Sequence, residues 1–470
     1  MKIALVLMPW YRRESPCPEL ALTVAVLREK NHKVYVYDLN NETFCAQYRN
    51  RGFWKFFLLD APREVRDDFF EKTRDVFEDF ASRILSQGVD IIIFKIAGRT
   101  YHCSSQMAKV IKRIDPCKVL VASGFLFPSK EYEDEFINGP ESSFDFVIFG
   151  EDEIALPKLL NALENNTAHL LGTRIEKAGR VISYIKDNII EDLDRLPFYD
   201  FSDFDLTSYR FPDRLEMFIS KGCVWRCCFC VDWVVEKRYR SMSGERIYRE
   251  MLYQSKMYKN GHFRFCDKTI NGDIKALNVL CDLLVEGYKS GLKEMYWSGD
   301  AMVRPEMTRD FLAKMYKAGC RGLGYGIESG SQDVIDKMGK RFSVDLAEEV
   351  LRNTYNAGIH TDINILVGFP TENRVDFEKT MNFVRRNKEN IDELRLTYAG
   401  CRIHPGSILA TSPDRYNLLN TDTDFWSTKD GLNTYEERVK RSEAVCQLAL
   451  SLGIETRVNS RITRKAKINQ

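Results

Sequence analysis

The sequence predicts an α/β protein in which an N-terminal doubly wound, Rossmann-like parallel sheet precedes a partial (β/α)6 barrel of the TIM type. Three observations predict this fold class. Short apolar runs alternate with amphipathic segments along most of the chain, as in parallel sheets covered by helices. The 470 residues are too many for one ordinary core. A stretch rich in Pro and Asp interrupts the alternation over 190–212.

The first part of the chain contains five expected strands. They are nearly continuous in apolar residues, as buried parallel strands are, and they cover 2–8, 34–39, 90–97, 118–123 and 145–150. Amphipathic helices are expected over 19–30 and 64–86. Ligands of such sheets bind beyond the carboxyl ends of the strands. We therefore expect residues 1–165 to form a ligand-binding domain.

A hairpin and linker over 166–212 separate this domain from a second alternating region. Six strands are expected there, with a helical segment between each pair, over 215–222, 262–267, 294–299, 322–329, 361–369 and 393–400. Six units predict a partial barrel, whose active site would lie at the carboxyl ends of the strands. We assign 213–402 to this barrel and 403–470 to a C-terminal cap segment.

Composition and charge argue against several classes of protein. The formal net charge is +1, from 69 basic and 68 acidic residues, so no excess of basic residues indicates a nucleic-acid partner. The N-terminal apolar run is too short for a membrane span and lacks a secretory cleavage site. Thirteen cysteines do not indicate disulfides in a chain of this kind, because the cytosol keeps thiols reduced. We expect a cytoplasmic protein with neither a membrane span nor a nucleic-acid partner.

Four of the cysteines crowd together directly after the first expected barrel strand. Cys223, Cys227 and Cys230 follow the pattern CxxxCxxC, whereas Cys228 is out of register and is expected to be a bystander. Three thiolates at these spacings can bind a cubane and leave its fourth iron open to another molecule. A zinc site would need a fourth ligand, and neither a second cysteine pair nor a nearby His is present in the sequence. The spacing therefore favours a [4Fe–4S] cluster over zinc or over buried apolar thiols.

This cysteine pattern, with an aromatic residue before its last Cys, resembles the signature of the radical S-adenosylmethionine (SAM) superfamily. Downstream, GLGYGIESGSQDVIDKM and AGIHTDINILVGFPTENRVDF resemble the barrel of its cobalamin-dependent and methylthiolating branches. The resemblance covers residues 215 to about 400. It implies that the open iron chelates SAM, and that one electron cleaves SAM to a 5′-deoxyadenosyl radical. Gly324 and Gly326 would then permit close backbone approach, unless they are simply turn glycines.

Five residues of the barrel receive more specific expectations. Phe229 would contact the adenine of SAM, as the aromatic residue at that position does in the family. Arg304 could hold the SAM carboxylate bidentately, or lie in solvent at a helix N-terminus. Glu328 could bind the ribose or a substrate cation, or form a structural ion pair. Ser298 and Asp267 are polar residues near expected strand ends, and the sequence gives less reason to place them in the binding site.

Residues 1–165 resemble the cobalamin-binding (B12-binding) domain found upstream of radical SAM barrels. The matching segments are PELALTVAVLREKNHKVYVYDLN, SGFLFPS and FDFVIFGEDE, followed by the linker IIEDLDRLPFYDF. The turn after the first strand has no G-x-G-x-x-G, which argues against a dinucleotide. The DxHxxG motif that places a His below cobalt is also absent, so His102 is the one conceivable lower ligand.

The turn Ser123–Gly124 and the loop Gly150–Glu151 would then bind the cobalamin phosphate. Together the two resemblances predict a radical SAM enzyme with a [4Fe–4S] cluster, SAM and cobalamin. Its expected reaction is methyl transfer from methylcobalamin to an unactivated carbon or phosphorus. The alternatives are a cobalamin-dependent rearrangement or cyclisation without methylation, and a non-catalytic or redox-sensing iron–sulfur protein. The substrate could be a small molecule, a lipid or a peptide, and the electron donor would be of the flavodoxin or ferredoxin type.

Overall fold

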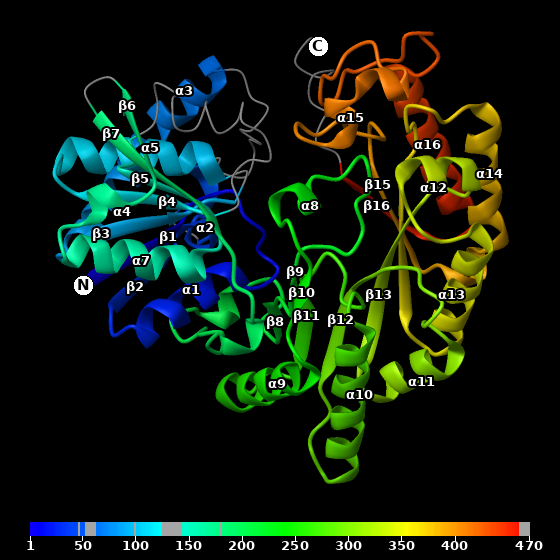
Figure 1. The fold of residues 1–470 in the computed structure, drawn as a ribbon, viewed down its shortest axis with the longest axis horizontal. Coiled ribbons are helices and arrows are strands. Elements are labelled where there is room, and N and C mark those ends of the chain that lie inside the picture. The colour runs from blue at the N-terminus through cyan, green and yellow to red at the C-terminus, as the bar shows by residue number, and fades with distance from the viewer. Residues whose placement is uncertain (46–47, 52–62, 98–99, 125–142, 178–179, 460–470) are drawn as a thin grey trace. The chain divides into compact units, whose positions relative to one another are not determined.

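The structure is a computed structural model that describes residues 1–45, 48–51, 63–97, 100–124, 143–177 and 180–459. The chain divides into two compact units, Met1–Glu216 and Met217–Gln470. Each unit is built on a largely parallel sheet with helices packed against it (Figure 1), which confirms the predicted fold class.

The first unit has a seven-stranded sheet. Its strands are β1 (Lys2–Leu7), β2 (Lys33–Asp38), β3 (Ile91–Lys95), β4 (Val119–Ser123), β5 (Phe146–Gly150), β6 (Thr173–Lys177) and β7 (Arg180–Asn188). They lie in the order β2-β1-β3-β4-β5-β7-β6, and β6 runs antiparallel to β7. Because β7 pairs in parallel with β5, the hairpin expected in 166–212 extends the sheet.

Helices cover both faces of this sheet (Figure 1). They are α1 (Pro18–Glu29), α2 (Leu39–Glu42), α3 (Arg63–Lys72), α4 (Arg74–Leu85), α5 (Tyr101–Ile114) and α7 (Asp152–Glu164). α1 packs against α7, and α4 packs against α5. The single helix expected over 64–86 is divided at Thr73, whose buried hydroxyl donates to the carbonyl of Phe69. Such side-chain bonds to the preceding turn compete with regular helix.

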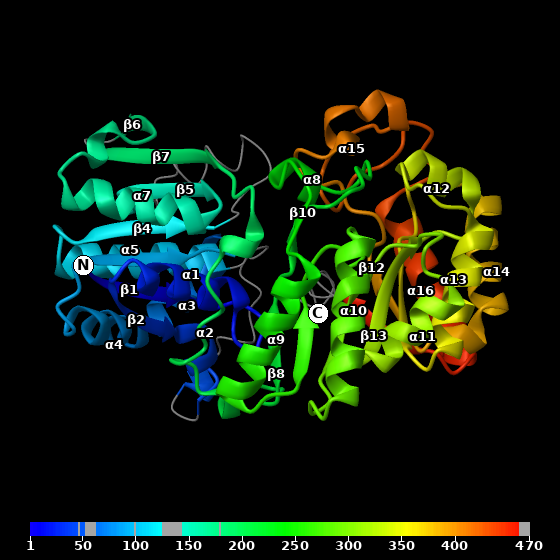
Figure 2. The same ribbon diagram turned by 60° about the horizontal axis from the view of Figure 1, so that its bottom comes forward.

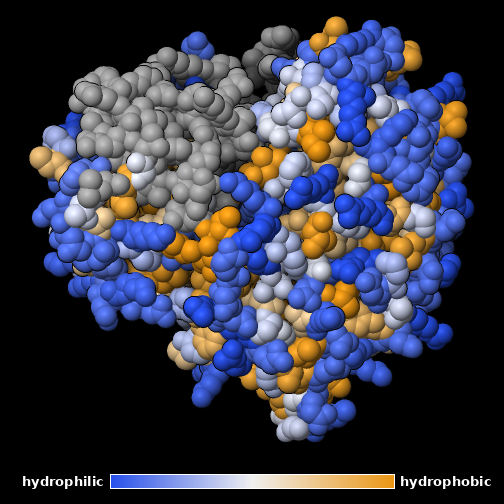
Figure 3. Space-filling view, in the orientation of Figure 1, coloured by the Kyte–Doolittle hydropathy of each residue, from blue (hydrophilic) through white to orange (hydrophobic). Residues whose placement is uncertain are grey.

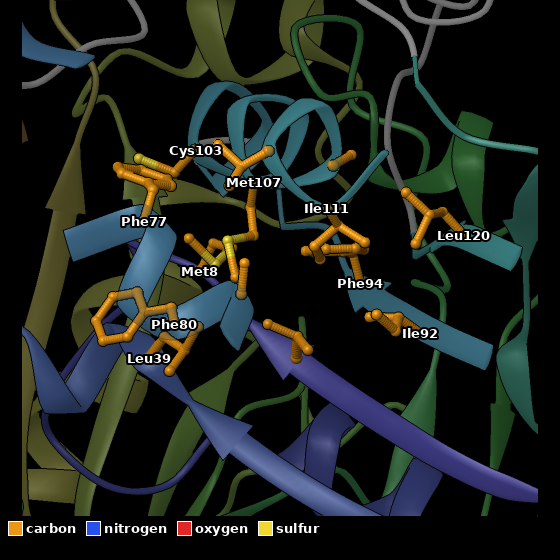
Figure 4. Close-up of a cluster of buried hydrophobic side chains, with 14 of the residues drawn as sticks. Met8, Leu39, Phe77, Phe80, Ile92, Phe94, Cys103, Met107, Ile111 and Leu120 are labelled. Atoms are coloured by element: carbon orange, nitrogen blue, oxygen red, sulfur yellow. The ribbon is translucent and has the colours of Figure 1, made fainter. Parts of the chain in front are cut away.

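The main core of the first unit lies between the sheet and the helices α4 and α5. Figure 4 shows Phe77 and Phe80 of α4, Met107 and Ile111 of α5 and Phe94 of β3 within one apolar cluster. Alternate strand residues supply this cluster, and the intervening residues are also fully buried. Burial on both faces explains why the strands are continuous in apolar residues.

The second unit is built on a curled sheet of seven strands, the first of which along the chain spans the boundary between the two units (Figures 1 and 2). In sheet order the strands are β16 (Glu455–Asn459), β15 (Glu393–Thr397), β14 (His360–Ile365), β13 (Cys320–Glu328), β12 (Tyr296–Ala301), β11 (His262–Phe265) and β8 (Arg214–Met217). β16 is a seventh strand that the sequence does not predict. Its sequence, ETRVN, is too short and too polar to indicate a strand. It pairs in parallel with β15.

The helices of this unit line the convex side of the sheet, as α10, α11, α13 and α14 show in Figures 1 and 2. The longer ones are α9 (Gly244–Tyr258), α10 (Ile274–Lys289), α11 (Arg309–Lys317), α12 (Gln332–Met338), α13 (Val344–Asn356), α14 (Arg374–Arg386) and α16 (Tyr435–Ser451). Two short helices are α8 (Asp232–Val235) and α15 (Ile408–Thr411).

The surface drawn in Figure 3 is mostly hydrophilic, with apolar residues scattered among charged ones. Single exposed apolar residues are normal on a protein surface and need no partner. Across the described part of the chain, no helix has both the length and the apolar character needed to cross a membrane.

Candidate functional site

The three expected cluster ligands share one loop of the second unit. This loop follows β8 and joins the short strands β9 (Ser220–Lys221) and β10 (Arg240–Ser241). The two strands pair antiparallel and close the loop at its base. Cys227 is buried, whereas Cys223 and Cys230 are partly exposed. The carboxyl end of the sheet is where barrels of this type place their active sites.

Two carboxylates hold the start of this loop, that of the buried Asp267 and that of the half-buried Glu236. Asp267 accepts hydrogen bonds from the backbone N–H of Ile219 at 3.1 Å and of Ser220 at 2.5 Å, and from the Ser220 hydroxyl at 2.5 Å. Glu236 accepts the N–H of Gly222 at 2.6 Å. Because Asp267 takes these N–H groups, the strand expected over 215–222 is interrupted between β8 and β9. The sequence indicates only that Asp267 is a polar residue near a strand end. In the structure it is a positioning residue for the cysteine loop.

Burial dominates the electrostatics of both carboxyl groups. It raises the pKa of Asp267 to about 7, although the hydrogen bonds from Ser220 and Ile219 oppose the rise. It also raises the pKa of Glu236, against the nearby charge of Lys268. Burying a carboxylate is costly unless donors surround it, and the loop backbone supplies these donors.

The environment of the three thiols fits an iron–sulfur cluster. The Sγ of Cys230 accepts the N–H of Asp232 at 3.4 Å, a contact that also suits a metal-bound thiolate. Burial raises the pKa of all three thiols, to about 12 for Cys230. A bound metal offsets this cost because it takes the thiolate form. Over the described residues, no three His, Cys, Asp or Glu side chains are placed to hold one metal ion. A cubane needs no such group, since each cysteine binds a different iron.

Cys228 belongs to a different environment. Its N–H donates to the carbonyl of Met338 at 2.9 Å, and its own carbonyl accepts the N–H of Leu409 at 3.1 Å. Its side chain is buried in an apolar cluster with residues such as Phe369 and Trp426. Burial raises the pKa of its thiol to about 11. The structure thus gives Cys228 a packing contact in place of a position facing its three neighbours.

Glu328 and Phe229 lie around one buried lysine. Glu328 ends β13 in the left-handed region, with φ 67°, and its carboxylate is 3.3 Å from the Nζ of Lys340. The Nζ lies 6.0 Å from the centre of the Phe229 ring. Of the two roles expected for Glu328, an ion pair is present here. Left-handed backbone in a non-glycine residue costs energy and is concentrated at functional sites.

Arg304 follows β12 as the sequence suggests, whereas Ser298 is not at a strand end, and contacts of either residue with SAM stay predictions. The Arg304 guanidinium donates to the carbonyls of Asn271 at 2.8 Å and Gly272 at 3.0 Å, and it pairs with Glu306 at 2.9 Å. Four of its five N–H groups are thus used, so a SAM carboxylate bound bidentately would have to displace one of these partners. Ser298 lies inside β12 and not at its end, because the strand continues to Ala301.

An ion-pair network that the sequence does not indicate crosses the concave side of the curled sheet. Asp300 of β12 contacts Arg264 of β11 at 3.0 Å and Arg395 of β15 at 3.3 Å, and Arg395 also pairs with Asp362 of β14. Arg395 can reach Asp300 only across β13 and β14. The one signal in the sequence is a charged residue at alternate positions of otherwise apolar strands, which does not say which strands meet.

The carboxyl edge of the first sheet carries the residues expected to contact cobalamin. The Ser123 hydroxyl donates to Asp152 at 2.5 Å, and Asp152 pairs with Lys95 of β3 at 2.5 Å. Burial lowers the pKa of Lys95, but Asp152 and Glu19 raise it overall. Gly124 has φ 138°, and a Cβ there would lie 2.3 Å from the nearest carbonyl oxygen. Most of the turn expected over 123–129 lies outside the described residues.

The other expected contacts lie near this edge. Gly150 ends β5 with φ 114°, and Glu151 is buried, with its carboxylate accepting the N–H of Ile190 at 2.5 Å. His102 is in the first turn of α5, and its Nε2 lies 3.3 Å from a guanidinium nitrogen of Arg66. A role for His102 below cobalt stays a prediction.

Comparisons with known proteins agree with this site. Residues 217–384 match the model of the Radical SAM superfamily. A protein of Pyrococcus horikoshii named as an uncharacterised methyltransferase is 25% identical over 352 residues, covering 73% of this chain and 74% of that protein. The anaerobic magnesium-protoporphyrin IX monomethyl ester cyclase of Rubrivivax gelatinosus is 22% identical over 331 residues, covering 67% of this chain and 57% of the cyclase. The chain thus spans little more than half the length of the cyclase.

A solved structure shares the fold of nearly the whole chain. It is the radical SAM methyltransferase TsrM of Kitasatospora setae with cobalamin and a [4Fe–4S] cluster bound. The TM-score is 0.65 at 14% identity, covering 94% of this chain and 84% of TsrM. A radical SAM domain implies a [4Fe–4S] cluster and SAM, which confirms these two predicted cofactors. With this domain over residues 217–384 and the cysteine loop in it, the chain is a radical SAM enzyme.

Proposed function

We propose that this chain is a cobalamin-dependent methyltransferase that transfers a methyl group to an unactivated carbon or phosphorus atom. The observation that carries the proposal is the loop of Cys223, Cys227 and Cys230 behind β8, in a chain whose first unit is a doubly wound sheet. Support for methyl transfer comes from the relative named as a methyltransferase and from the fold shared with TsrM, whose structure holds cobalamin.

The residues of the second unit would hold the cluster and SAM. Cys223, Cys227 and Cys230 would each bind one iron, and Asp267 and Glu236 would keep their loop in place. Phe229 would contact the adenine and Glu328 the ribose or a substrate cation. When bound, the cluster and SAM supply a 5′-deoxyadenosyl radical, and cobalamin supplies the methyl group.

The residues of the first unit would hold cobalamin at the carboxyl edge of their sheet. Ser123 and Gly124 are at the end of β4, and Gly150 and Glu151 are at the end of β5, so backbone N–H groups of both turns would face the ligand, while the Ser123 hydroxyl already donates to Asp152. Such donors fit a phosphate and amide groups. In this mode of binding, cobalt would need no ligand from the protein. If a side chain does ligate cobalt, His102 is the candidate. Binding without a protein ligand would leave cobalt easy to reduce and remethylate.

Metal analysis tests the proposal. The chain would be purified anaerobically with added hydroxocobalamin, and iron, sulfide and cobalt would be measured. We expect about four irons and about one cobalt per chain. Cys227→Ala should lose the iron, whereas the neighbouring Cys228→Ala should keep it, because Cys228 packs in an apolar cluster. Iron without cobalt would refute the cobalamin-dependent mechanism, and zinc in place of iron would refute the cluster.

A radical cyclisation or rearrangement without methylation is the second candidate. Similarity to the cyclase of Rubrivivax gelatinosus favours it. With SAM, a reductant and trial small-molecule, lipid or peptide substrates, methyl transfer should yield S-adenosylhomocysteine alongside 5′-deoxyadenosine. Cyclisation should yield 5′-deoxyadenosine alone. Formation of neither would favour a redox-sensing iron–sulfur protein. Reduced flavodoxin or ferredoxin should replace the chemical reductant, if the donor is of that type.

A further inference from the structure

Lys340 is a buried ammonium group beside the cysteine loop. Its side chain is only 5% exposed, and it follows α12, far from the loop in sequence. The Nζ donates to the carbonyl of Gly326 at 2.7 Å and lies 3.3 Å from the carboxylate of Glu328. These contacts fix the charge in one place, away from water.

Three aromatic rings surround the same ammonium group. The Nζ lies 5.6 Å from the ring centre of Trp225, 6.0 Å from that of Phe229 and 5.8 Å from that of Phe342. Trp225 also stacks on Phe342, with ring centres 5.8 Å apart. Trp225 and Phe229 lie two residues before and two residues after Cys227 in the sequence, so the ammonium group of Lys340 lies next to the cysteine loop. The faces of these rings attract a cation and exclude water, and a charge acts more strongly where water is excluded.

Backbone contacts hold the segment before Lys340 against the cysteine loop. The N–H of Cys228 donates to the carbonyl of Met338 at 2.9 Å, and the Sγ of Cys228 lies 3.5 Å from the carbonyl oxygen of Lys337. The ammonium group of Lys340 is therefore held next to the part of the loop that contains Cys227.

Gly326 leaves the space that this arrangement needs. A Cβ at this position would lie 3.1 Å from the Nζ of Lys340 and 2.9 Å from an oxygen of Glu328. Both distances are shorter than ordinary contacts, so a side chain here would push the pair apart. The absence of a side chain at Gly326 therefore allows Lys340 and Glu328 to form their ion pair.

We propose that Lys340 raises the reduction potential of the cluster on Cys223, Cys227 and Cys230. The inference rests on the proposed function only in requiring the cluster. Reduction adds one electron from an external one-electron donor, and no bond forms or breaks. The reduced cluster carries one more negative charge, so a fixed cation nearby stabilises it, and local charge is known to set cluster potentials. Glu328 lowers the potential by the same reasoning.

The test is a redox titration of the cluster-loaded, SAM-free enzyme, followed by electron paramagnetic resonance of the reduced cluster. Lys340→Met keeps the length of the side chain and removes its charge. We expect at least a tenfold loss in the equilibrium constant for reduction, which is about 59 mV toward more negative potential for one electron. Glu328→Gln should shift the potential the other way, and Lys340→Arg should stay close to the wild type.

Lys337→Met is a matched control. Lys337 is on the same segment, but it is 46% exposed and pairs with Asp333 at the surface, so no shift is expected. Opposite shifts in Lys340→Met and Glu328→Gln cannot come from general loss of packing, which would move both in one direction.

Three results would overturn the inference. One is a potential that does not change in Lys340→Met at wild-type iron content. Another is a shift in the same direction for Lys340→Met and Glu328→Gln. The third is weaker SAM binding in Lys340→Met without a shift, which would make Lys340 a SAM ligand only. If the wild type takes up no iron, the proposed function itself fails. If Lys340→Met alone loses the cluster, Glu328→Gln and Lys340→Arg still decide the question.

Discussion

Asp267→Asn would test how the cysteine loop is held, because it keeps the shape of the side chain and replaces a carboxyl that can ionise with an amide that cannot. In the wild type the carboxylate accepts hydrogen bonds from the backbone N–H groups of Ile219 and Ser220 and from the Ser220 hydroxyl. Asn offers one acceptor oxygen, and its amide nitrogen is a donor. All three donors contact Oδ1, which Asn can supply, but Oδ2 lies 3.2 Å from the Ile219 N–H, so an amide nitrogen there would set two donors against each other at a cost of about 1–3 kcal/mol.

The size of the effect should depend on pH. Burial raises the pKa of Asp267 from 3.8 to about 7, so the folded state holds this proton more tightly than the unfolded state. Stability contributed by the protonated carboxyl is therefore present below about pH 4 and lost as the pH rises toward 7. At about 1.4 kcal/mol per pKa unit, the wild type has lost ~2 kcal/mol of this stability at pH 5, where only the unfolded state ionises, and ~4 kcal/mol at pH 8.

Asn does not titrate, so the substitution should be more destabilising at pH 5 than at pH 8, by about 2–3 kcal/mol. The assay is urea unfolding of the cluster-free protein at both pH values, followed by the fluorescence of the buried Trp297 and Trp426. Removing the cluster keeps metal binding out of the measurement. Asp333→Asn is the control, because its carboxylate is 54% exposed and pairs with Lys337 at the surface.

Equal destabilisation at pH 5 and pH 8 would refute the raised pKa of Asp267. No destabilisation at pH 5 would refute the clamp itself, because the donors of Ile219 and Ser220 would then have found other acceptors. A pH dependence of similar size in Asp333→Asn would show that the effect is general to the protein.

Two further predictions concern the first unit and use urea unfolding. Lys95→Met leaves Asp152 buried without its counter-ion and should cost ~3–5 kcal/mol, most of which Lys95→Met with Asp152→Leu should restore. A double variant as unstable as Lys95→Met alone would contradict this explanation. Gly124→Ala should cost ~2–4 kcal/mol, because its Cβ would lie 2.3 Å from a backbone oxygen at φ 138°. Gly88→Ala, with φ 60° and no atom nearer than 4.0 Å, should cost only ~1 kcal/mol, and equal losses would contradict the steric reason.

The sequence predicts the parts of this enzyme that depend on local pattern. Apolar runs give the order of most strands, and the spacing of Cys223, Cys227 and Cys230 gives the cluster loop, because both signals lie within a few residues. It does not predict β16, whose five residues are mostly polar and gain their place from pairing with β15. The sequence also places Ser298 near the end of a strand, because polar residues that follow an apolar run usually indicate that the strand ends there. In the structure β12 continues, because Asp300 finds partners on the concave side.

The glycines of β13 show what kind of information is missing from the sequence. The pattern GLGYGIES correctly predicts close approach to the backbone, but it does not say what approaches. At Gly324 a Cβ would lie 2.3 Å from Asp300, and at Gly326 it would lie 2.9 Å from Glu328 and 3.1 Å from Lys340. The approaching groups are thus charged side chains of the same unit: Asp300 from before β13, Glu328 from its last residue and Lys340 from after it. A bound ligand would leave the same glycines in the sequence, so only the fold separates the two explanations. The charges that surround the site are therefore set by long-range contacts, whereas the ligands of the cluster are set by local spacing.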